Sequence, residues 1–336
     1  MENFHSTVNS HQFLAGGDLS DTGDTINSLA NASGLYTYPS LTSFADDFSG
    51  GGTKTYTSYN QTVGNPNRTF HARELNVFAS DTWRASDRLT VNLGLRYERP
   101  KLPQPTEVNT SYYATGVISS PGLDLAPRAG FAYKVSDKTV IRAGYGFYYA
   151  PFPGQFVDEL FLGNGLYQTN ITVNPNQTGA PIFPNVVSAT GLPKGASNLF
   201  FANSKLRNPL AQEGSALLET HIGRYSSLTF GYNRSRGYKL WTAVDLNLVT
   251  PTKLETYTID NLAGQAVATY LTSYWTGKND ANFGHLYNLQ NNGSIWYQSG
   301  TAQWQSQFSH GLSLSAVYTY TSVSYTHLDV YKRQVL

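Results

Sequence analysis

Hydrophobic and polar residues alternate along several stretches of the chain, and the clearest stretch is 89–98, Leu-Thr-Val-Asn-Leu-Gly-Leu-Arg-Tyr-Glu. Successive side chains of a β-strand point to opposite faces. One face of this strand therefore carries Leu89, Val91, Leu93, Leu95 and Tyr97. Such a strand belongs either to a soluble sheet whose apolar face covers a core, or to a membrane barrel whose apolar face meets lipid and whose polar face meets a wet lumen.

The same alternation recurs in four pairs of segments, each joined by a short polar turn. The pairs are 73–84 with 89–99, 125–135 with 139–149, 213–223 with 227–235, and 295–308 with 312–322. Turns of this length connect hairpin strands. The joins between pairs are long and hold most of the prolines, which paired strands tolerate poorly; they are 100–124, 150–212 and 236–294. The sequence therefore predicts antiparallel hairpins whose connections alternate between short and long.

This alternation of connection length favours the membrane barrel. Long loops are uncommon in compact soluble domains, whereas outer-membrane barrels have short periplasmic turns and long extracellular loops. A strand of about ten residues at ~3.3 Å per residue, tilted by ~45°, crosses roughly the ~25 Å apolar band of that membrane. We expect an all-β fold, an antiparallel meander that forms a partial transmembrane β-barrel of about eight or more strands. A soluble sandwich, whose strands also alternate, is the alternative.

The barrel interpretation assigns strand residues to lipid or to the lumen. The residues expected to face lipid are Val91, Leu93, Leu95, Phe230, Leu314 and Ala316. The residues expected to face the lumen are Asn92, Arg96, Thr229 and Ser313. The apolar face should be unusually exposed in a structure without lipid, and burial against a second layer would support the sandwich.

Three segments are expected along the chain: a loop and strand segment, 1–72; the partial barrel, 73–322; and a tail of different origin, 323–336. A short helix is expected near 40–48, because apolar residues at helical spacing follow Ser40, a suitable N-cap. The tail back-translates to DNA that is nearly its own reverse complement and resembles two head-to-head transposon ends from a sequencing library. We interpret it as a translated adapter and expect the native sequence to be cut near Ser322.

Composition excludes some classes of protein. Charged residues make up 13% of the chain and the net charge is +1, so no nucleic-acid partner is indicated. The lack of Cys fits an oxidising compartment. No apolar run reaches the ~18 residues of a transmembrane helix, and no signal peptide is visible at the start, so we expect an exported protein to be represented here by a fragment.

Candidate catalytic and metal chemistry is sparse. The sequence contains no H-E-x-x-H, no G-x-S-x-G and no Gly-rich phosphate loop. We therefore predict a protein that is not an enzyme, with no catalytic residues, no cofactor and no metal site. Asp18, Asp21 and Asp24 are spaced so that they can wrap Ca²⁺, but the full calcium-loop pattern is missing and a solvated acidic loop is preferred.

Several motifs resemble those of a known family. Segment 78–84, Phe-Ala-Ser-Asp-Thr-Trp-Arg, followed by 89–98, is similar to the Q-D-x-W…L-T-L-N-x-G-L-R-Y-E signature of TonB-dependent outer-membrane receptors of the Oar-like branch. Further similar motifs are 126–133 (A-P-R-x-G-F-A-Y), 141–146 (R-x-G-Y-G), 232–240 (Y-x-G-S-R-G-x-x-L) and 309–320 (S-H-G-L…Y-T-W). Ser80 departs from the usual Gln, and Asn233-Arg234 departs from the usual x-Gly.

The resemblance implies a barrel of about 22 strands that holds a plug domain. It implies an internal fragment: the plug and the TonB-contacting box would lie upstream, and the last strands would lie beyond Ser322. The implied function is energised uptake of a bulky nutrient, oligosaccharide- or peptide-like, across the bacterial outer membrane. The implied partners are outer-membrane lipid, the plug of the same protein, and the TonB complex through the missing N-terminal region.

Aromatic residues in the long joins are the candidate substrate contacts, because such rings stack on sugars or contact peptides. These residues are Tyr167, Phe183, Phe200, Phe201, Trp241 and Trp275. The alternative is that they pack the loops against each other. Two other functions stay open, a surface adhesion barrel without transport and an outer-membrane enzyme with a catalytic site at the rim. A plug with a TonB box in the complete gene would favour transport, and its absence would favour adhesion.

Overall fold

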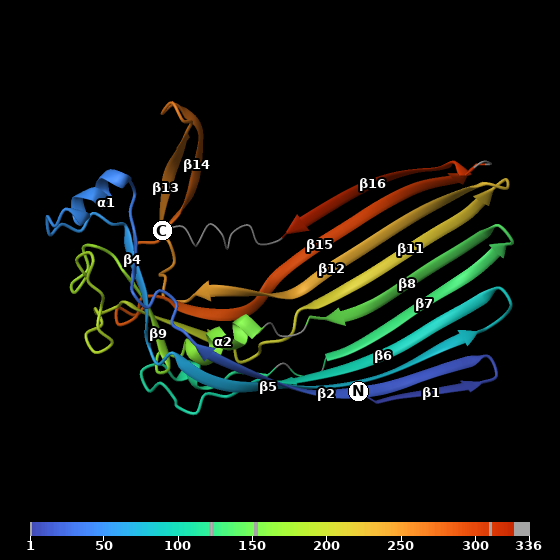
Figure 1. The fold of residues 1–336 in the computed structure, drawn as a ribbon, viewed down its shortest axis with the longest axis horizontal. Coiled ribbons are helices and arrows are strands. Elements are labelled where there is room, and N and C mark those ends of the chain that lie inside the picture. Colours follow the sequence, from blue (N-terminus) through green and yellow to red (C-terminus); the bar gives the residue numbers. More distant parts are fainter. Residues whose placement is uncertain (1, 121, 123, 151–153, 309–310, 326–336) are drawn as a thin grey trace.

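A tilted wall of paired β-strands with a folded cap at one end makes up residues 2–120, 122, 124–150, 154–308 and 311–325, which a computed structural model describes (Figure 1). The strands of the wall are β1 (Glu2–Val8), β2 (His11–Asn27), β5 (Asn67–Arg84), β6 (Leu89–Lys101), β7 (Asp124–Ser136), β8 (Thr139–Tyr149), β11 (Leu210–Ile222), β12 (Ser226–Asp245), β15 (Leu286–Gln307) and β16 (Ser313–Tyr325). Each strand is antiparallel to the next in that order. The four predicted hairpins are therefore confirmed.

The wall begins earlier than the boundary that the sequence suggested at residue 73. β1 pairs with β2, and β2 pairs with β5 along its whole length. Ala15, Gly17 and Asp21 alternate with other residues along β2, so this strand lacks the run of large apolar side chains that marks 89–98. Segment 1–72 thus contributes β1 and β2 to the wall, and a helix, α1 (Leu41–Phe48), lies where the short helix was predicted.

Cross-strand register places the predicted lipid-facing residues together on one face. A continuous row crosses seven neighbouring strands through Leu89, Tyr133, Ile141, Leu218, Phe230, Ala302 and Tyr318. Leu93 is 50% exposed, Phe230 is 47% exposed and Leu314 is 45% exposed, and none of them joins a buried apolar cluster. The expected exposure is confirmed for five of the six residues, Val91 being only partly exposed, and the sandwich alternative fails because no second layer within the described residues covers this face.

Polar contacts follow the opposite face, as predicted for the lumen. The Thr82 hydroxyl donates to Asn92 Oδ1 over 2.9 Å, and Arg96 forms an ion pair with Glu98. Further along the wall, Arg142 Nη1 lies 2.9 Å from Glu219 Oε2. These charged groups would be costly against lipid, so their position supports a wet interior.

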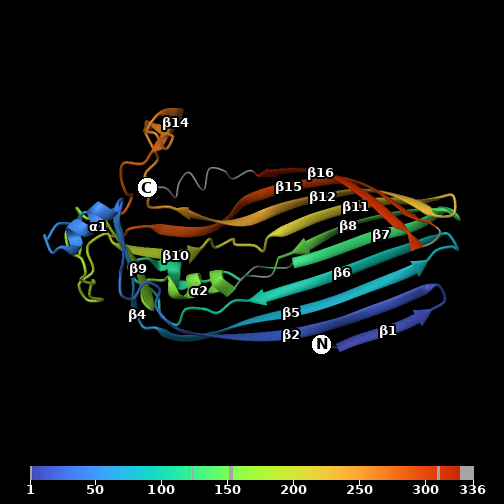
Figure 2. The ribbon, with the colours of Figure 1, turned by 45° about the horizontal axis from the view of Figure 1, so that its top comes forward.

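The long joins are not structureless loops, as their prolines suggested, but fold together with residues 28–66 into a cap at one end of the wall (Figure 2). The cap contains β3 (Leu35–Thr37), α1, β4 (Ser58–Gly64), a 3₁₀ turn (Tyr113–Gly116), α2 (Gly154–Leu162), β9 (Gln168–Val173) and β10 (Ser197–Ala202). β10 runs parallel to β15, starting at Leu199 opposite Leu286, and extends the sheet through β9 and β4 to β3. This parallel pair departs from the expected meander, because β10 arrives from a long insertion rather than from a turn.

A separate hairpin, β13 (Lys253–Asp260) and β14 (Ala266–Tyr274), projects away from the wall beside the cap (Figure 1). At the C-terminal end of the described chain, β16 continues through residues 323–325. The first part of the suspected adapter therefore pairs with β15. Residues 326–336 lie outside the described residues, and the adapter origin stays a prediction. Among the described residues, no helix has the length and apolarity needed to cross a membrane.

The two faces of β12 make a matched pair for testing the wall. Phe230→Lys should lower the free energy of unfolding in phospholipid vesicles by about 2–4 kcal/mol, because it places a charge against lipid near mid-membrane. Thr229→Lys, one residue away on the lumen face beside Glu219, should change it by less than about 1 kcal/mol. Denaturant titration monitored by tryptophan fluorescence measures both variants. Equal destabilisation would show that the faces are misassigned.

Candidate functional site

An aromatic cluster lies at the outer part of the cap, formed by Tyr36, Tyr38, Phe44, Phe48 and Phe183. Tyr36 lies in β3, Phe44 and Phe48 lie one turn apart on α1, and Phe183 comes from the segment after β9. The Phe183 ring centroid lies 5.4 Å from that of Tyr36 and 5.8 Å from that of Phe44, both edge to face. Two parts of the chain that are far apart in sequence, 36–48 and the segment around Phe183, thus meet at one set of rings.

One side of this aromatic cluster is open to solvent. Phe48 is 69% exposed and the neighbouring Leu41 on α1 is 81% exposed. Ile182 and Val186, on either side of the Phe183 segment, are also exposed. An exposed apolar patch of this kind, rimmed by polar loops, is typical of a binding surface.

Asp47 anchors α1 beneath the aromatic cluster. Its buried carboxylate accepts hydrogen bonds from the Thr53 hydroxyl (2.9 Å), the Thr55 backbone N–H (3.1 Å) and the Tyr38 hydroxyl (3.1 Å). Burial acts to raise the pKa of Asp47, but the hydrogen bonds from Thr53 and Thr55 outweigh it and hold the pKa below its ordinary value. Burial also raises the pKa of Tyr38 to about 12, so its phenol stays protonated and donates to Asp47.

Below the aromatic cluster, a buried core supports the loop sheet. Tyr56, Tyr59, Ile171 and Val173 pack there with residues of the 180–196 segment. The Tyr56 hydroxyl donates to the Pro181 carbonyl over 2.8 Å, and the Val187 N–H donates to Gln61 Oε1 over 3.0 Å. These contacts fix the segment that carries Phe183.

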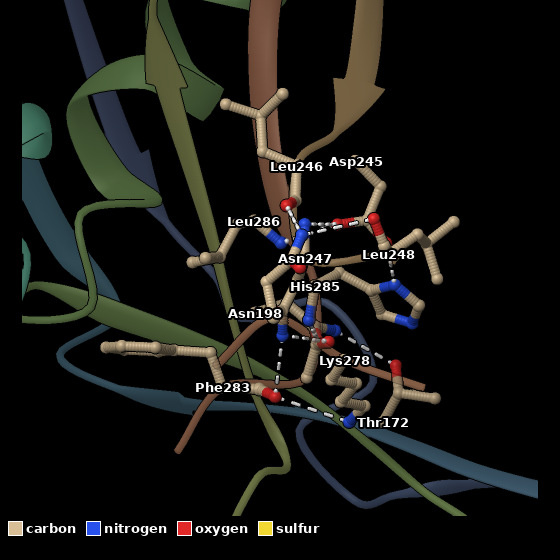
Figure 3. A network of polar contacts seen from close by, with 12 residues as sticks. Thr172, Asn198, Asp245, Leu246, Asn247, Leu248, Lys278, Phe283, His285 and Leu286 are labelled. Carbon is tan, nitrogen blue, oxygen red and sulfur yellow. Dashed lines mark hydrogen bonds and ion pairs between the residues drawn. The ribbon is translucent and has the colours of Figure 1, made fainter. Parts of the chain in front are cut away.

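A second polar network joins the cap to the wall where β12 ends and β15 begins (Figure 3). Asp245 Oδ2 lies 2.7 Å from His285 Nδ1, and Asp245 Oδ1 accepts from the backbone N–H groups of Asn247 and Leu286 at 2.9 Å each. The fully buried Asn247 amide donates to the carbonyls of Phe283 and Gly284, both at 3.0 Å. Asp245 and Asn247 therefore hold the loop that leads into β15.

The same network reaches the loop sheet. Asn198 of β10 accepts from the His285 N–H over 2.9 Å and donates to Thr172 of β9 over 3.0 Å. Lys278 Nζ donates to the Gly195 carbonyl over 3.1 Å, and burial lowers the pKa of this ammonium group. The Asp245–His285 pair thus holds the two strand ends together, and the other hydrogen-bond partners of the Asp245 carboxylate are backbone N–H groups.

The described parts of the chain contain no group of three or more His, Cys, Asp or Glu placed to hold a metal ion. The Ca²⁺ alternative for Asp18, Asp21 and Asp24 is wrong in its geometry, because all three lie in β2, where Asp21 points to the opposite face from the other two. The preferred acidic loop is likewise wrong. Asp21 instead contacts Arg73 Nε at 2.9 Å and His71 Nδ1 at 2.8 Å.

The six candidate aromatic residues lie in different places. Phe183 belongs to the aromatic cluster, and Phe200 and Trp241 are partly buried against the core around α2. Tyr167 is 5% exposed and its hydroxyl accepts from the Thr106 N–H over 2.8 Å; Phe201 is also 5% exposed, against Tyr112. Trp275 is partly exposed near the projecting hairpin. Only Phe183 thus contributes to the aromatic cluster, and the substrate role of all six stays a prediction.

Sequence reasoning did not single out the other members of the aromatic cluster. The signal was present, because Phe44 and Phe48 are four residues apart after the Ser40 cap, which accepts from the Ser43 N–H. Tyr36 lies in the short strand β3, and Tyr38 follows directly after it. Their convergence with Phe183 depends on the pairing of β4 with β3 and with β9, and no local sequence pattern predicts that pairing.

Comparison with known proteins gives a consistent result. Residues 1–326 match the family model described as an outer membrane beta barrel domain. No curated protein sequence matches the chain. Among solved structures, the outer membrane transporter YddB from Escherichia coli is 12% identical, with a TM-score of 0.55 over 96% of this chain and 32% of that one.

Two further solved structures have similar folds. The FrpB iron transporter from Neisseria meningitidis is 10% identical, with a TM-score of 0.52 over 97% of this chain and 36% of that one. The ferric enterobactin receptor PfeA from Pseudomonas aeruginosa is 13% identical, with a TM-score of 0.51 over 95% of this chain and 34% of that one. The chain thus spans about a third of the length of these proteins, and at this identity the likeness shows the fold.

Asp47 and its exposed neighbour Asp46 make a matched pair. Asp47→Asn should raise the rate of amide exchange across 41–58 by about tenfold or more, because it weakens the hydrogen bonds to a buried charged acceptor. Asp46→Asn should leave exchange unchanged. In the unsubstituted protein the lowered pKa means that protection is fully present above the ordinary Asp pKa of ~3.9 and is lost as pH falls through the folded value. Protection that instead increases on acidification would contradict this role.

Asn247 offers a test of the second network. Asn247→Ala removes donors to two buried carbonyls and should destabilise the 275–286 segment by about 1–3 kcal/mol, detected as faster proteolytic cleavage there. Asn282→Ala in the same loop changes an exposed side chain and is the control. If both variants are cleaved at the same rate, the Asn247 contacts do not hold the loop.

Proposed function

The chain belongs to the outer membrane β-barrel domain family, and on that premise we propose that it forms wall strands and part of the extracellular cap of a transporter in the bacterial outer membrane. The cargo we propose is a bulky nutrient, oligosaccharide- or peptide-like. Uptake would be energised from the inner membrane through the TonB complex, as in the receptors that the sequence motifs resemble. Assignment to the Oar-like branch stays a prediction.

The observation that carries this proposal is the folded cap. An insertion that only closed a strand connection would not need an internal sheet, a buried tyrosine core and two polar networks. Instead, the cap holds the aromatic cluster at the outer end of the wall over a buried core, with Leu41 and Phe48 exposed. Rigid exposed rings give a large contact area at low entropic cost, which suits the flat faces of sugars and peptide side chains.

The polar inner face supports the proposed partners. Arg96, Glu98, Arg142 and Glu219 line it in ion pairs, so the interior suits water or the polar surface of a plug domain. The apolar outer face supports contact with membrane lipid. The plug and the TonB complex are inferred from the family resemblance.

The projecting hairpin β13–β14 favours a second candidate, adhesion without transport. Leu254, Val267 and Leu271 are all exposed on it, at 60% or more. A hairpin that presents apolar side chains away from the cap can contact another surface. Cargo uptake separates the two functions, because an adhesion barrel transports nothing.

The test uses the complete protein that contains this chain, expressed in cells with and without TonB. Fluorescent oligosaccharides, fluorescent peptides and a ferric chelate are offered as cargo; the ferric arm is included because similar folds are named as iron and ferric enterobactin proteins. We expect TonB-dependent uptake of one of the first two, reduced about tenfold or more by the pair Phe48→Ala and Phe183→Ala. Val108→Ala, an exposed apolar residue elsewhere in the loops, is the control. Uptake of the ferric chelate alone would overturn the cargo class, and no TonB-dependent uptake would overturn transport.

A further inference from the structure

Charged residues replace apolar ones at a fixed height on the lipid-facing side of the wall. Along β6 the outward positions read Leu89, Val91, Leu93, Leu95 and Tyr97, and then Arg99 and Lys101. About ten residues from the short turn, at ~3.3 Å each and a tilt of ~45°, bring the chain up by roughly 23 Å. Arg99 therefore lies where the ~25 Å apolar band of the membrane ends, on the side of the long loops.

The neighbouring strand adds a third cation at the same height. In the register of β5 and β6, Arg73 stands directly opposite Lys101, and Leu75 stands opposite Arg99. Leu19 of β2 completes the row beside Leu75. Like charges directly opposite each other destabilise a sheet, so the Arg73–Lys101 pair favours a negative partner, part of which Asp21 of β2 supplies from its place opposite Arg73.

The charges within the protein do not supply that partner in full. Asp21 contacts Arg73 through Nε, and it is also bonded to His71. Glu74 and Glu98 alternate to the lumen face, where Glu98 pairs with Arg96. Among the described residues, neither the Arg99 guanidinium nor the Lys101 ammonium group has a hydrogen-bond or ion-pair partner.

A groove of about 700 Å³ runs across these residues. Its lining includes Leu19, Leu75 and Tyr97 below and Arg73, Arg99 and Lys101 above, together with Pro100, Ser120, Gly122 and one residue with a carboxyl group, Glu74. Apolar side chains face the acyl region while the cations face the headgroup region. This order matches the order of groups in an anionic membrane lipid.

We propose that Arg73, Arg99 and Lys101, with Leu19, Leu75 and Tyr97 beneath them, form a binding site for the phosphorylated headgroup of a membrane lipid. The guanidinium groups bind phosphate oxygens through charge-assisted hydrogen bonds, and Lys101 acts as a point charge. The acyl chains lie on the leucines and on the tyrosine ring. The site is on the lipid side of the wall, so it is independent of the proposed transport.

The Arg234 region shows why the charges alone do not define the site. Arg234 and Arg236 also lie on the outward face of β12, at a similar distance from its short turn. Their guanidinium groups, however, lie 4.8 and 3.9 Å from the centroid of the Trp296 ring. Cation–π contacts already occupy these cations, whereas Arg99 and Lys101 are available to a ligand.

The experiment measures lipid binding to the complete protein that contains this chain, in detergent, by native mass spectrometry. The probes are dioleoyl phosphatidate, which is anionic, and dioleoyl phosphatidylcholine, whose net charge is zero. The test variant carries Arg99→Gln and Lys101→Gln. The control variant carries Arg88→Gln and Lys138→Gln, the same loss of charge at the short-turn end.

Phosphatidate should bind the test variant about 30-fold more weakly than the parent, from roughly 1 kcal/mol per basic residue, and the control variant less than threefold more weakly. Equal losses in both variants, or none in the test variant, would overturn the site. Equal binding of phosphatidylcholine by the parent would show that only the apolar groove matters. Displacement of the lipid by millimolar inorganic phosphate would identify a site for free anions instead.

Folding of each variant is checked by its resistance to unfolding in detergent at room temperature. If the double variant does not fold, Lys101→Gln alone should weaken phosphatidate binding about fivefold, because it removes one exposed charge. An unchanged affinity in that single variant would likewise contradict the proposal.

Discussion

Backbone hydrogen bonding between neighbouring strands is the constraint on which the rest of this structure depends. Lipid offers no partner to a peptide N–H or C=O group, so a wall in the membrane must pair every strand with its neighbours. The antiparallel ladder from β1 to β16 does this for every strand between its two edge strands. Once the ladder is set, the two-residue period of the strand decides which side chains meet lipid and which meet the lumen. The apolar row from Leu89 to Tyr318 and the inward ion pairs are consequences of the same register.

The cap depends on this ladder at a single join. β10 pairs in parallel with β15 and is followed in the sheet by β9, β4 and β3, so strands from segment 1–72 and from the 150–212 join become one sheet with the wall. Asp245 and Asn247 brace that join, and Asp47 fixes α1 above it. The exposed rings of the aromatic cluster are therefore held both by polar contacts and by the buried core around Tyr56 and Tyr59. Such an arrangement suits a surface that must keep its shape while exposing apolar groups to water.

Much of the wall could be predicted from the sequence, because alternation at period two is a local signal and the short turns punctuate it. The lipid-facing role of Leu93 and Phe230 followed from that signal alone. β2 was not predicted, because Ala15, Gly17 and Asp21 interrupt the apolar side chains on its outward face. Its place in the wall is set by pairing with β5. The cap could not be predicted from the sequence for a different reason. Its contacts join residues far apart in sequence, such as Phe183 with Tyr36, and the prolines that border its elements are read locally as loop. The position of Arg73 beside Lys101 could likewise not be predicted, because it depends on the register between β5 and β6.

The most direct test of the central claim is a scan of collision accessibility along β6. The chain has no Cys, so single cysteines at positions 89–99 can carry a nitroxide label without background reaction. With the protein in lipid bilayers, accessibility to apolar oxygen and to a water-soluble nickel complex should alternate with a period of two residues and in opposite phase. Labels at 91, 93 and 95 should collide with oxygen, and labels at 90, 92 and 94 with nickel. A period near 3.6 residues, or uniform access of nickel to both faces, would show that this segment does not form a membrane wall.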